Sequence, residues 1–428
     1  MSSNPDEGED VITLEERSET DLSDCGLKDD DFHFLEELEH ISSASITKQK
    51  VEIGPYIGHI GLPSGAFLEV LPKSSLDGFK PLYFLAKAGR ISEELVTGSQ
   101  EIGFSVGESF IEVVGEVYAE EVNRLLQAGI HKQYVPRQAA TNHVKGRLRV
   151  AEQLSKQEPY ATSFESQFND LTADIPLNQL ILFAAVEVAR KISDKRVERR
   201  LQRQISDLQR VVSLPRTAPH PSQITLTRET QMYKPIVKFA EQILNETYID
   251  TFGQRARLLQ SVLINTETLF EEVVYSFVAD LIRGSRYIIQ GDGDPESSVK
   301  RDIGHLLRDK FGNGLQGMQP DVFLRSRGNP VWVADAKWRE DSSPKRNNLY
   351  QVTSYQRKVG GPAIMFYPEQ GGQIETVYEL SDDEYDDSSI TELRVVEVPL
   401  GGESYEEFET KAQNKIRTAM QAQLPGLA

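Results

Sequence analysis

The stretch from Pro320 to Tyr355 constrains the fold more than any other part of this 428-residue sequence. It holds two short apolar runs that are rich in β-branched and aromatic residues, Val322–Leu324 and Val331–Ala334. The residues between them, Arg325–Pro330, include Ser, Gly, Asn and Pro, which are typical of turns. Two such runs joined by turn residues predict a β-hairpin.

Each strand of the predicted hairpin presents a carboxylate near one end. Asp321 opens the first strand, and Asp335 lies late in the second, two residues before Lys337. Because side chains alternate across a strand, Asp335 and Lys337 point to the same face, and antiparallel pairing brings Asp321 close to both. Two carboxylates beside an ammonium suit a hard divalent cation such as Mg²⁺, next to a group that stabilises or activates a water molecule.

Two predicted helices flank the hairpin in the sequence. Upstream, apolar residues at helical spacing run from 269 to 282, and Glu271 lies on this helix, where it can supply a third carboxylate. Downstream, Gln351 and Tyr355 lie one turn apart on a second helix and face the same way. Tyr355 also has the simpler interpretation of packing its helix onto the sheet. Taken singly, each of these motifs is common in turns and solvated strand ends, and it is their order that favours a functional site.

A Glu on a helix, Pro-Asp on a strand, Asp-Ala-Lys on the next strand and Gln-x-x-x-Tyr on a helix resemble the PD-(D/E)xK nuclease core. Within the PD-(D/E)xK nucleases, the resemblance is to the branch that shares the Gln-x-x-x-Tyr element with RecB-type nucleases. More narrowly, the chain resembles the McrC family, the nuclease subunit of the McrBC modification-dependent restriction system. This narrower resemblance covers residues 45–400 and also rests on Phe67–Lys73, Phe270–Glu271, Asn348–Gln351 and Ala363–Pro368.

The resemblance implies a Mg²⁺-dependent endodeoxyribonuclease that hydrolyses phosphodiester bonds. A bound metal ion would polarise the phosphate and lower the pKa of a bound water molecule. Lys337 would orient that water or stabilise the developing negative charge. Gln351 and Tyr355 would position the substrate backbone or the metal shell. The implied metal ligands are Glu271, Asp321, Asp335 and the carbonyl group of Ala336.

The resemblance also implies a partner, a hexameric McrB-type AAA+ GTPase that recognises modified double-stranded DNA, such as DNA with 5-methylcytosine. The chain contains no G-x-x-x-x-G-K-[ST] motif, so the nucleotide, GTP by resemblance, is expected on the partner. Residues 312–317 match G-x-G-x-x-G, but the sequence predicts a helix before them and a strand after them, which is the wrong order for a dinucleotide site. We expect a flexible loop beside the active site there.

The first half of the chain predicts two further regions of an α+β multidomain protein. Residues 1–44 are expected to be an acidic disordered tail, because they carry most of the net charge of −19 and few apolar residues. Residues 45–116 show short alternating runs separated by Gly and Pro, which predict a β-rich domain with strands that include 82–85 and 110–114. The resemblance makes this β-rich domain the contact with the partner.

The remaining predicted regions are a mainly helical middle, residues 117–254, and a PD-(D/E)xK nuclease domain, residues 255–428. Helical periodicity runs from Pro176 to Leu214, and the later part of this stretch is basic in an otherwise acidic chain. It is the candidate surface for DNA phosphates, and the alternative is a solvated helix with i,i+4 ion pairs. The candidate DNA-binding residues are Arg196, Arg199, Arg200 and Arg203.

Composition bears on the location of the protein. The sequence lacks both the apolar run of about 18 residues that suggests a membrane-spanning helix and an apolar signal-peptide segment. Cys25 is the single cysteine, which excludes an internal disulfide and a cysteine zinc cluster and fits a reducing compartment. We therefore expect a cytoplasmic protein without a membrane partner.

Two alternative functions remain open from the sequence. One is a nuclease with the same core that acts in DNA repair with another motor or with none, and a neighbouring gene for an AAA+ GTPase would argue against it. The other is a non-catalytic adaptor that binds partners through the acidic tail and the β-rich domain. The intact set of Asp321, Asp335 and Lys337 favours an enzyme over an adaptor.

Overall fold

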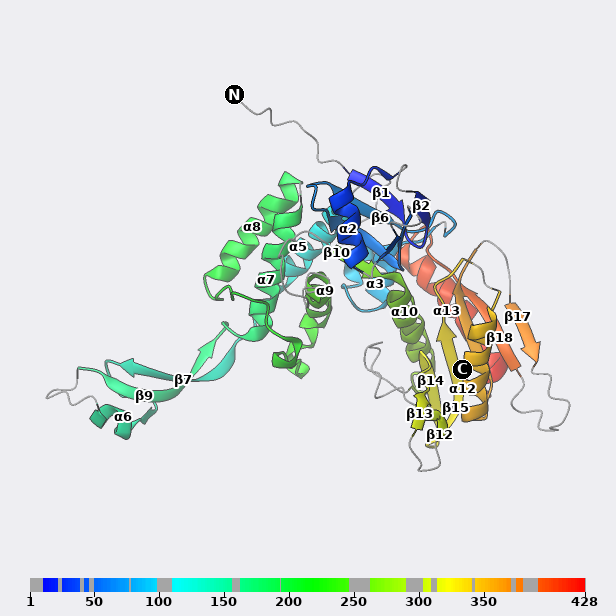
Figure 1. Ribbon diagram of the computed structural model, residues 1–428. Coiled ribbons are helices and arrows are strands. Elements are labelled where there is room, and N and C mark those ends of the chain that lie inside the picture. The colour runs from blue at the N-terminus through cyan, green and yellow to red at the C-terminus, as the bar shows by residue number, and fades with distance from the viewer. Residues whose placement is uncertain are drawn as a thin grey trace, which may run out of the picture. The chain divides into compact units, whose positions relative to one another are not determined.

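The protein is an α+β protein with several sheets, and the computed structural model divides it into two compact units (Figure 1). The first unit comprises Met1–Phe110 and Ile249–Ala428, and the second comprises Ile111–Tyr248. Among the described residues, no helix has the length and apolar character needed to cross a membrane. The structure describes residues 11–21, 25–38, 42–45, 50–76, 78–97, 110–155, 162–192, 194–245, 262–289, 303–308, 314–340, 343–370, 375–379 and 392–427.

A six-stranded sheet forms the centre of the C-terminal part of the first unit. The predicted hairpin is confirmed, with Val322 opposite Ala334 and Ser326 opposite Asn329. The two residues that turn the chain, Arg327 and Gly328, both have positive φ angles, as a tight hairpin turn requires. The sheet order is β11 (Tyr287–Ile289), β14 (Val322–Ser326), β15 (Asn329–Ala336), β16 (Ala363–Pro368), β18 (Glu392–Val398) and β17 (Glu375–Glu379).

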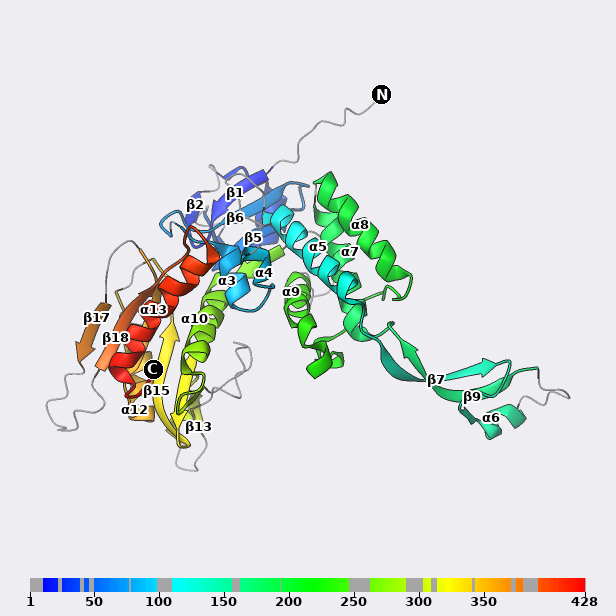
Figure 2. The same ribbon diagram turned by 180° about the vertical axis from the view of Figure 1, so that it is seen from behind.

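The middle of this sheet is parallel and covered on both faces. Strands β15, β16 and β18 pair in parallel, and every residue of β16 is buried. This fits the rule that parallel strands are covered by helices on both faces. Helix α12 (Arg346–Val359) lies on one face, while α10 (Thr266–Ile282) and α13 (Tyr405–Gln423) lie on the other (Figures 1 and 2). The helices predicted around Glu271 and Gln351 are therefore present.

A second sheet in the first unit joins strands from both ends of the chain. Its order is β1 (Val11–Glu15), β6 (Phe67–Leu71), β5 (Tyr56–Gly61) and β10 (Val262–Asn265). Strand β10 leads directly into α10, so this sheet is continuous in sequence with the helix that carries Glu271. A smaller sheet has the order β2 (Glu19–Asp21), β4 (Lys50–Ile53) and β3 (Ser42–Ser45).

The prediction that residues 1–44 form a disordered tail is wrong for the part that the structure describes. Strand β1 pairs in parallel with β6, and helix α2 (Asp29–Glu37) follows it. The apolar residues are few, but Leu14, Phe32 and Leu35 are all buried. Most of the neighbouring acidic side chains remain exposed or half-exposed, so a small number of apolar anchors suffices to fold this segment.

Two predicted strands in the β-rich region are helical instead. Residues 82–85 lie in α3 (Pro81–Lys87), and residues 110–114 open α5 (Phe110–Ala128). A short continuous apolar run does not distinguish a buried helix from a buried strand, and here the helix starts at Pro81, a residue favoured in the first turn.

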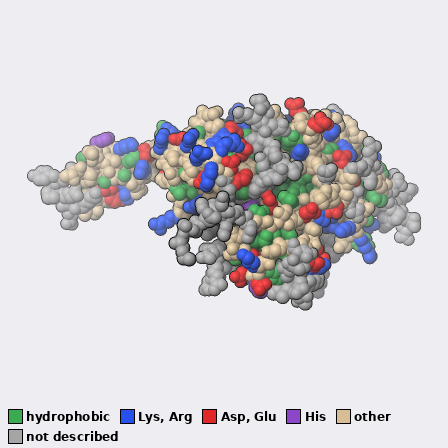
Figure 3. All heavy atoms as spheres, turned by 90° about the horizontal axis from the view of Figure 1, so that it is seen from above, with side chains coloured by type: hydrophobic (Ala, Val, Ile, Leu, Met, Phe, Trp, Pro, Cys, Tyr) green, Lys and Arg blue, Asp and Glu red, His purple; other side chains and the backbone are tan. Residues whose placement is uncertain are grey.

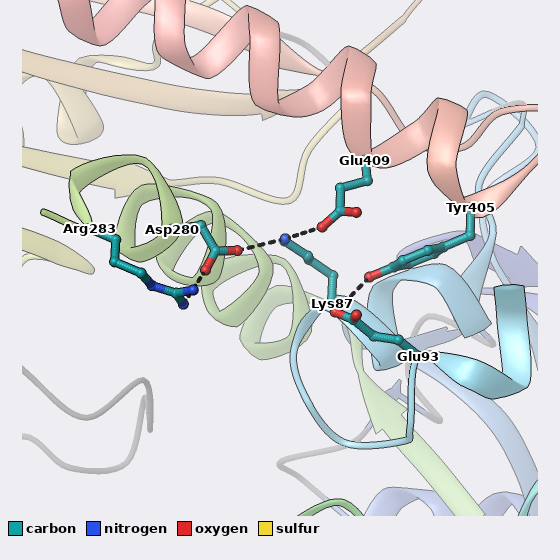
Figure 4. Close-up of polar contacts among 6 residues, drawn as sticks. All are labelled: Lys87, Glu93, Asp280, Arg283, Tyr405 and Glu409. Carbon is teal, nitrogen blue, oxygen red and sulfur yellow. Dashed lines mark hydrogen bonds and ion pairs between the residues drawn. The ribbon is translucent and has the colours of Figure 1, made fainter. Parts of the chain in front are cut away.

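Helix α3 is tied to α10 and α13 by an ion cluster around the buried Lys87 (Figure 4). The Lys87 ammonium donates hydrogen bonds to Asp280 at 2.8 Å and Glu409 at 2.6 Å, and it lies 4.4 Å from the centre of the Phe277 ring. Burial alone would lower the pKa of Lys87, but its two carboxylate partners outweigh burial and raise that pKa. Segments more than 300 residues apart are thereby joined.

The G-x-G-x-x-G segment also differs from its predicted form. Residues 314–317 form β13 (Gly314–Gly317), which pairs with β12 (His305–Arg308), so the element described before it is a strand and not a helix. The interpretation as a flexible loop is wrong for these residues, while residues 312 and 313 lie outside the described chain.

The second unit combines helices with an extended β arm. The predicted helical region after Pro176 is two helices, separated near Asp194, whose side chain caps the second one. The arm pairs β7 with β9 over nine residues, and most of its side chains are exposed (Figure 1). The helices are α5, α7 (Pro176–Lys191), α8 (Lys195–Gln209) and α9 (Lys234–Asn245). The arm contains β7 (Gln133–Thr141), β8 (Arg147–Leu148), α6 (Val150–Ser155) and β9 (Phe164–Thr172).

Candidate functional site

The two acidic residues of the hairpin meet at one end of strands β14 and β15. Because Val322 pairs with Ala334, Asp321 follows in register opposite Asp335. Asp321 Oδ2 accepts a hydrogen bond of 2.7 Å from the Ala336 backbone N–H. This bond fixes the first carboxylate against the end of β15, and the Asp335 side chain beside it is 1% exposed.

Lys337 completes this group from the position directly after the end of β15. Its Nζ atom lies 2.6 Å from Asp335 Oδ2, and its own side chain is 17% exposed. Its backbone N–H donates to the Phe366 carbonyl at 2.8 Å, which extends the pairing with β16 by one residue. The other oxygen of Asp335, Oδ1, is buried and has no hydrogen-bond partner among the described residues. This buried carboxylate oxygen therefore lacks a protein N–H or hydroxyl donor among the described residues.

Negative charge exceeds positive charge at this point. Burial, followed by the nearby Asp335 and Glu271 carboxylates, raises the pKa of Asp321 well above its usual value. Burial also raises the pKa of Asp335, although the ammonium beside it acts in the opposite direction. For Lys337, burial would lower the pKa, but the attraction of the surrounding acids outweighs burial and raises it.

Glu271 approaches the same group from α10. Asn265 caps the start of the helix, because its side chain accepts a hydrogen bond of 2.9 Å from the Thr268 N–H. Glu271 is half-buried, and its charge contributes to the pKa shifts of both Asp321 and Lys337. The structure thus brings together residues of three elements that are separated by up to 66 positions in the sequence.

The donor set fits a divalent cation in its chemistry. Asp335 is buried and Asp321 beside it is partly buried, and the positive charge around them is too small to balance both carboxylates. A bound cation would relieve this excess of negative charge. Within the described ranges, however, no three Asp, Glu, His or Cys side chains are already arranged to hold a metal ion. Asp321 and Asp335 supply two adjacent carboxylates, and the charge of Glu271 acts on the same group.

Gln351 and Tyr355 lie on α12 beside this group. The Gln351 amide donates to the Tyr355 hydroxyl at 2.8 Å, and that hydroxyl donates to the Gln319 carbonyl at 3.2 Å. Burial, and to a smaller extent the Asp335 and Asp321 charges, raise the pKa of Tyr355 to about 12. The Tyr355 ring packs in the sheet core, so its packing role is real, while its hydroxyl fixes the loop that precedes Asp321.

No sequence motif assigns a role to Tyr367, which the structure places near the same charges. Tyr367 is the penultimate residue of β16, next to the end of β15, and it is fully buried. Burial raises its pKa, and the charges of Asp335, Lys337 and Arg339 all act on its hydroxyl. The signal that could have identified it is its place near the end of the strand parallel to the Asp-Ala-Lys strand.

The four candidate DNA-binding arginines lie on α8 in the second unit, where basic and acidic side chains gather together (Figure 3). Arg196 lies 2.8 Å from Glu116, and Arg200 pairs with Glu120, so both bind to α5. Arg199 donates to the Lys195 carbonyl at 2.8 Å. A hollow of about 450 Å³ is lined by Asn123, Arg196, Arg199, Arg200, Arg203 and Gln204. Arg196 and Arg200 thus serve to join α8 to α5.

Comparison with known proteins finds a matching family and solved structures that are similar to this chain. The family described as "McrBC 5-methylcytosine restriction system component" matches residues 51–368. No curated protein matches the sequence. A chain from a refined half-complex of Thermococcus gammatolerans McrB AAA+ hexamers with bound McrC is 16% identical, with a TM-score of 0.57, over 94% of this chain and 99% of that chain.

A chain from a cryo-EM structure of the Thermococcus gammatolerans McrBC complex is 15% identical, with a TM-score of 0.43, over 64% of this chain and 88% of that chain. At these identities the comparison with the half-complex shows a shared, McrC-like fold, and the family match rests on the sequence. The matched residues include Glu271, Asp321, Asp335 and Lys337 and cover most of the chain. The chain therefore belongs to the McrBC 5-methylcytosine restriction system component family.

Proposed function

We propose that this chain is the Mg²⁺-dependent DNA endonuclease subunit of a McrBC-like, modification-dependent restriction system. The observation that supports it best is the meeting of Asp321, Asp335 and Lys337 at one end of the hairpin, with Glu271 beside them. In this proposal the six-stranded sheet with α10, α12 and α13 is a PD-(D/E)xK core, within residues 255–428. Family membership supports the same conclusion, because the restriction system acts on DNA.

Each residue of the group has a distinct role in the proposed hydrolysis. Asp321, Asp335 and the Ala336 carbonyl, with Glu271 as the further carboxylate, would hold the metal ion. When bound, Mg²⁺ polarises the phosphate and lowers the pKa of a water molecule. The raised pKa of Lys337 keeps its side chain protonated, so it donates hydrogen bonds to the attacking water or to the phosphate as negative charge develops.

Gln351 and Tyr355 have a positioning role in this proposal. The hydroxyl of Tyr355 holds the backbone at Gln319, two residues before Asp321, and the exposed Gln351 side chain lies at the outer end of this hydrogen-bonded chain. The exposed amide is available to a DNA phosphate or to a water molecule of the metal shell.

We further propose that the chain acts with a McrB-type AAA+ hexamer that hydrolyses GTP and selects modified double-stranded DNA. The matched Thermococcus gammatolerans structure contains McrB AAA+ hexamers with bound McrC, and its fold is shared along nearly the whole chain. The region 45–116 is proposed as the partner contact. Exposed arginines on α8, Arg199 and Arg203 above all, are proposed to follow DNA phosphates.

The test is cleavage of methylated and unmethylated plasmid DNA with Mg²⁺, with and without the AAA+ partner and GTP. Wild type is compared with Asp335→Ala and Lys337→Ala, and Lys411→Ala is the control because Lys411 is exposed on α13 and pairs only locally with Glu407. The proposal expects cleavage that requires partner, GTP and methylation, that is lost in both site variants, and that is unchanged in the control.

Other results would support the alternatives. Cleavage that needs no partner and no methylation would indicate a repair-type nuclease with the same core. A chain that binds the partner and stimulates its GTPase but never cleaves DNA would be an adaptor. Full activity in Asp335→Ala and Lys337→Ala would refute the site.

A further inference from the structure

Glu16 lies in the segment whose composition predicts disorder, yet its side chain is 0% exposed inside the first unit. Its backbone is fixed on both sides: its N–H donates to the Leu71 carbonyl at 2.9 Å, and the residue forms a β-bridge with Ile53. A fully buried glutamate is rare unless it is paired or hydrogen-bonded. Its partners therefore indicate why it is there.

Both oxygens of the Glu16 carboxylate accept hydrogen bonds from residues far along the chain. Oε2 accepts from the Thr266 hydroxyl at 2.6 Å, and Oε1 accepts from the Trp338 indole N–H at 3.0 Å. An indole N–H is only a donor, and a carboxylate is an acceptor on both oxygens when ionised. Glutamate is thus matched to this position better than glutamine, which offers one acceptor and one donor group.

The two partners of Glu16 belong to the elements that carry the proposed catalytic residues. Thr266 is the first residue of α10, on which Glu271 lies. Trp338 directly follows Lys337, and its ring centre lies 4.9 Å from that of Phe79 and 5.5 Å from that of Phe270. Glu16 therefore connects the start of the Glu271 helix to the end of the Asp-Ala-Lys strand.

The next residue strengthens the same connection. Arg17 pairs with Glu267 in the first turn of α10 at 2.5 Å, and its N–H donates to the Ile53 carbonyl at 2.7 Å. Arg17 has a φ of 53°, in the left-handed region that non-glycine residues seldom adopt. A strained backbone conformation of this kind persists only where the surrounding structure enforces it, and such conformations are common at functional sites.

We infer that Glu16 is a positioning residue of the proposed nuclease site, which holds the Glu271 helix and the Lys337 strand end at the spacing that metal binding requires. The inference rests on the proposed function and adds the N-terminal segment to the catalytic unit. Glu16 does not touch the substrate. It acts through Thr266 and Trp338, and its loss loosens the third carboxylate and the ammonium relative to Asp321 and Asp335.

The test compares Glu16→Gln with Glu15→Gln in the full chain with the AAA+ partner. Glu15 is the adjacent residue on β1, is partly exposed, and has one long contact of 3.4 Å with Ser74. Substitution of a residue that orients metal ligands without touching the metal typically lowers metal affinity or activity by about 10- to 100-fold. We expect a loss of that size in the cleavage rate of Glu16→Gln, with unchanged DNA affinity, and no loss in Glu15→Gln.

A second readout needs no cleavage. Trp332 and Trp338 are the two tryptophans, so a Trp332→Phe background makes emission report on Trp338 alone. Titration with Mn²⁺ in the absence of DNA should change this emission, and Glu16→Gln should weaken the apparent affinity by about tenfold or more. The emission maximum of the metal-free variant should also shift, since the indole loses its carboxylate acceptor.

Thr266→Val is an independent variant that keeps the side-chain shape and removes the hydroxyl that donates to Glu16. If Glu16→Gln does not fold, this variant tests the inference in its place. Because both changes break the same contact, their combined effect should be smaller than the product of the two single effects. Wild-type cleavage and Mn²⁺ affinity in either folded single variant would overturn the inference. Absence of metal-dependent cleavage in wild type would instead refute the proposed function.

Discussion

Replacement of Asp321 by Asn should stabilise the metal-free protein while it abolishes the proposed nuclease. Asp321 and Asp335 lie side by side, and Lys337 is the ammonium that faces both. In Asp321→Asn the amide oxygen still accepts the hydrogen bond from the Ala336 N–H. The amide nitrogen turns towards Asp335, whose carboxyl is within hydrogen-bond reach of residue 321. Repulsion between two carboxylates thus becomes a hydrogen bond.

The size of the effect follows from the removed repulsion. Two unit charges about 4 Å apart interact by about 4 kcal/mol at an effective dielectric constant near 20, and the attraction of Asp321 to Lys337, also lost, offsets part of the gain. Asp321 is also partly exposed, which weakens the interaction further. We expect a net gain of about 1–3 kcal/mol in the free energy of unfolding, or a few degrees in Tm.

The gain in the free energy of unfolding should be larger at neutral pH than at acid pH. Burial and the neighbouring acids raise the pKa of Asp321 in the folded protein, so folding disfavours its ionised form. This penalty on wild type is full above the folded-state pKa and disappears as the pH falls below the unfolded-state value of about 4. The stability difference between Asp321→Asn and wild type should therefore be largest at neutral pH and shrink towards acid.

The assay is urea unfolding in EDTA at several pH values, with Asp335→Asn as the matched variant. Asp335→Asn removes the carboxylate that lies 2.6 Å from Lys337 Nζ, and the Lys337 side chain is only 17% exposed, so this variant should stabilise the protein less or destabilise it. Added Mg²⁺ should stabilise wild type by mass action but not Asp321→Asn. An Asp321→Asn protein no more stable than wild type at neutral pH, or a pH-independent difference, would refute the reasoning.

Three further changes test the packing around the site. Lys87→Met leaves the half-buried Asp280 and Glu409 carboxylates without their shared ammonium. Urea unfolding should show a free energy of unfolding lower by about 2–3 kcal/mol. A loss below about 0.5 kcal/mol would contradict this. Tyr355→Phe keeps the ring but removes the hydroxyl partner of Gln351, so stability should fall by about 1 kcal/mol and cleavage should fall too, whereas unchanged cleavage would leave Tyr355 a packing role alone. Gly361→Ala places a Cβ 2.2 Å from the Val331 carbonyl oxygen and should cost about 2–4 kcal/mol, which thermal unfolding would show.

Local sequence patterns determined the elements nearest the site. The hairpin from Val322 to Ala336, the helix that carries Glu271 and the helix that carries Gln351 each follow from periodicity and turn residues within one short segment. Strand alternation then predicted the approach of Asp321, Asp335 and Lys337, because pairing in a hairpin is fixed by the turn between its strands. Two carboxylates and an ammonium brought together by this hairpin indicate a divalent cation.

Other features depended on contacts between distant segments. The apolar run at residues 82–85 suits a strand or a helix, and packing of α3 against α10 and α13 selects the helix. Residues 11–38 contain too few apolar side chains to fold alone, and strand β6 supplies the partner that orders β1. A parallel pairing of this kind leaves no local pattern, because the two strands are more than 50 residues apart.

The sequence by itself determined the identity and order of the chemical groups at the site, since these are properties of short segments. The tertiary structure alone decided what surrounds them. Glu16 reads as one acid among many in an acidic stretch, and only the folded chain places it between Thr266 and Trp338, 250 and 322 residues away. Tyr367 likewise acquires its position from parallel pairing of β15 with β16. The physical reason is that burial and long-range hydrogen bonds depend on the whole chain, whereas periodicity and turn chemistry are local.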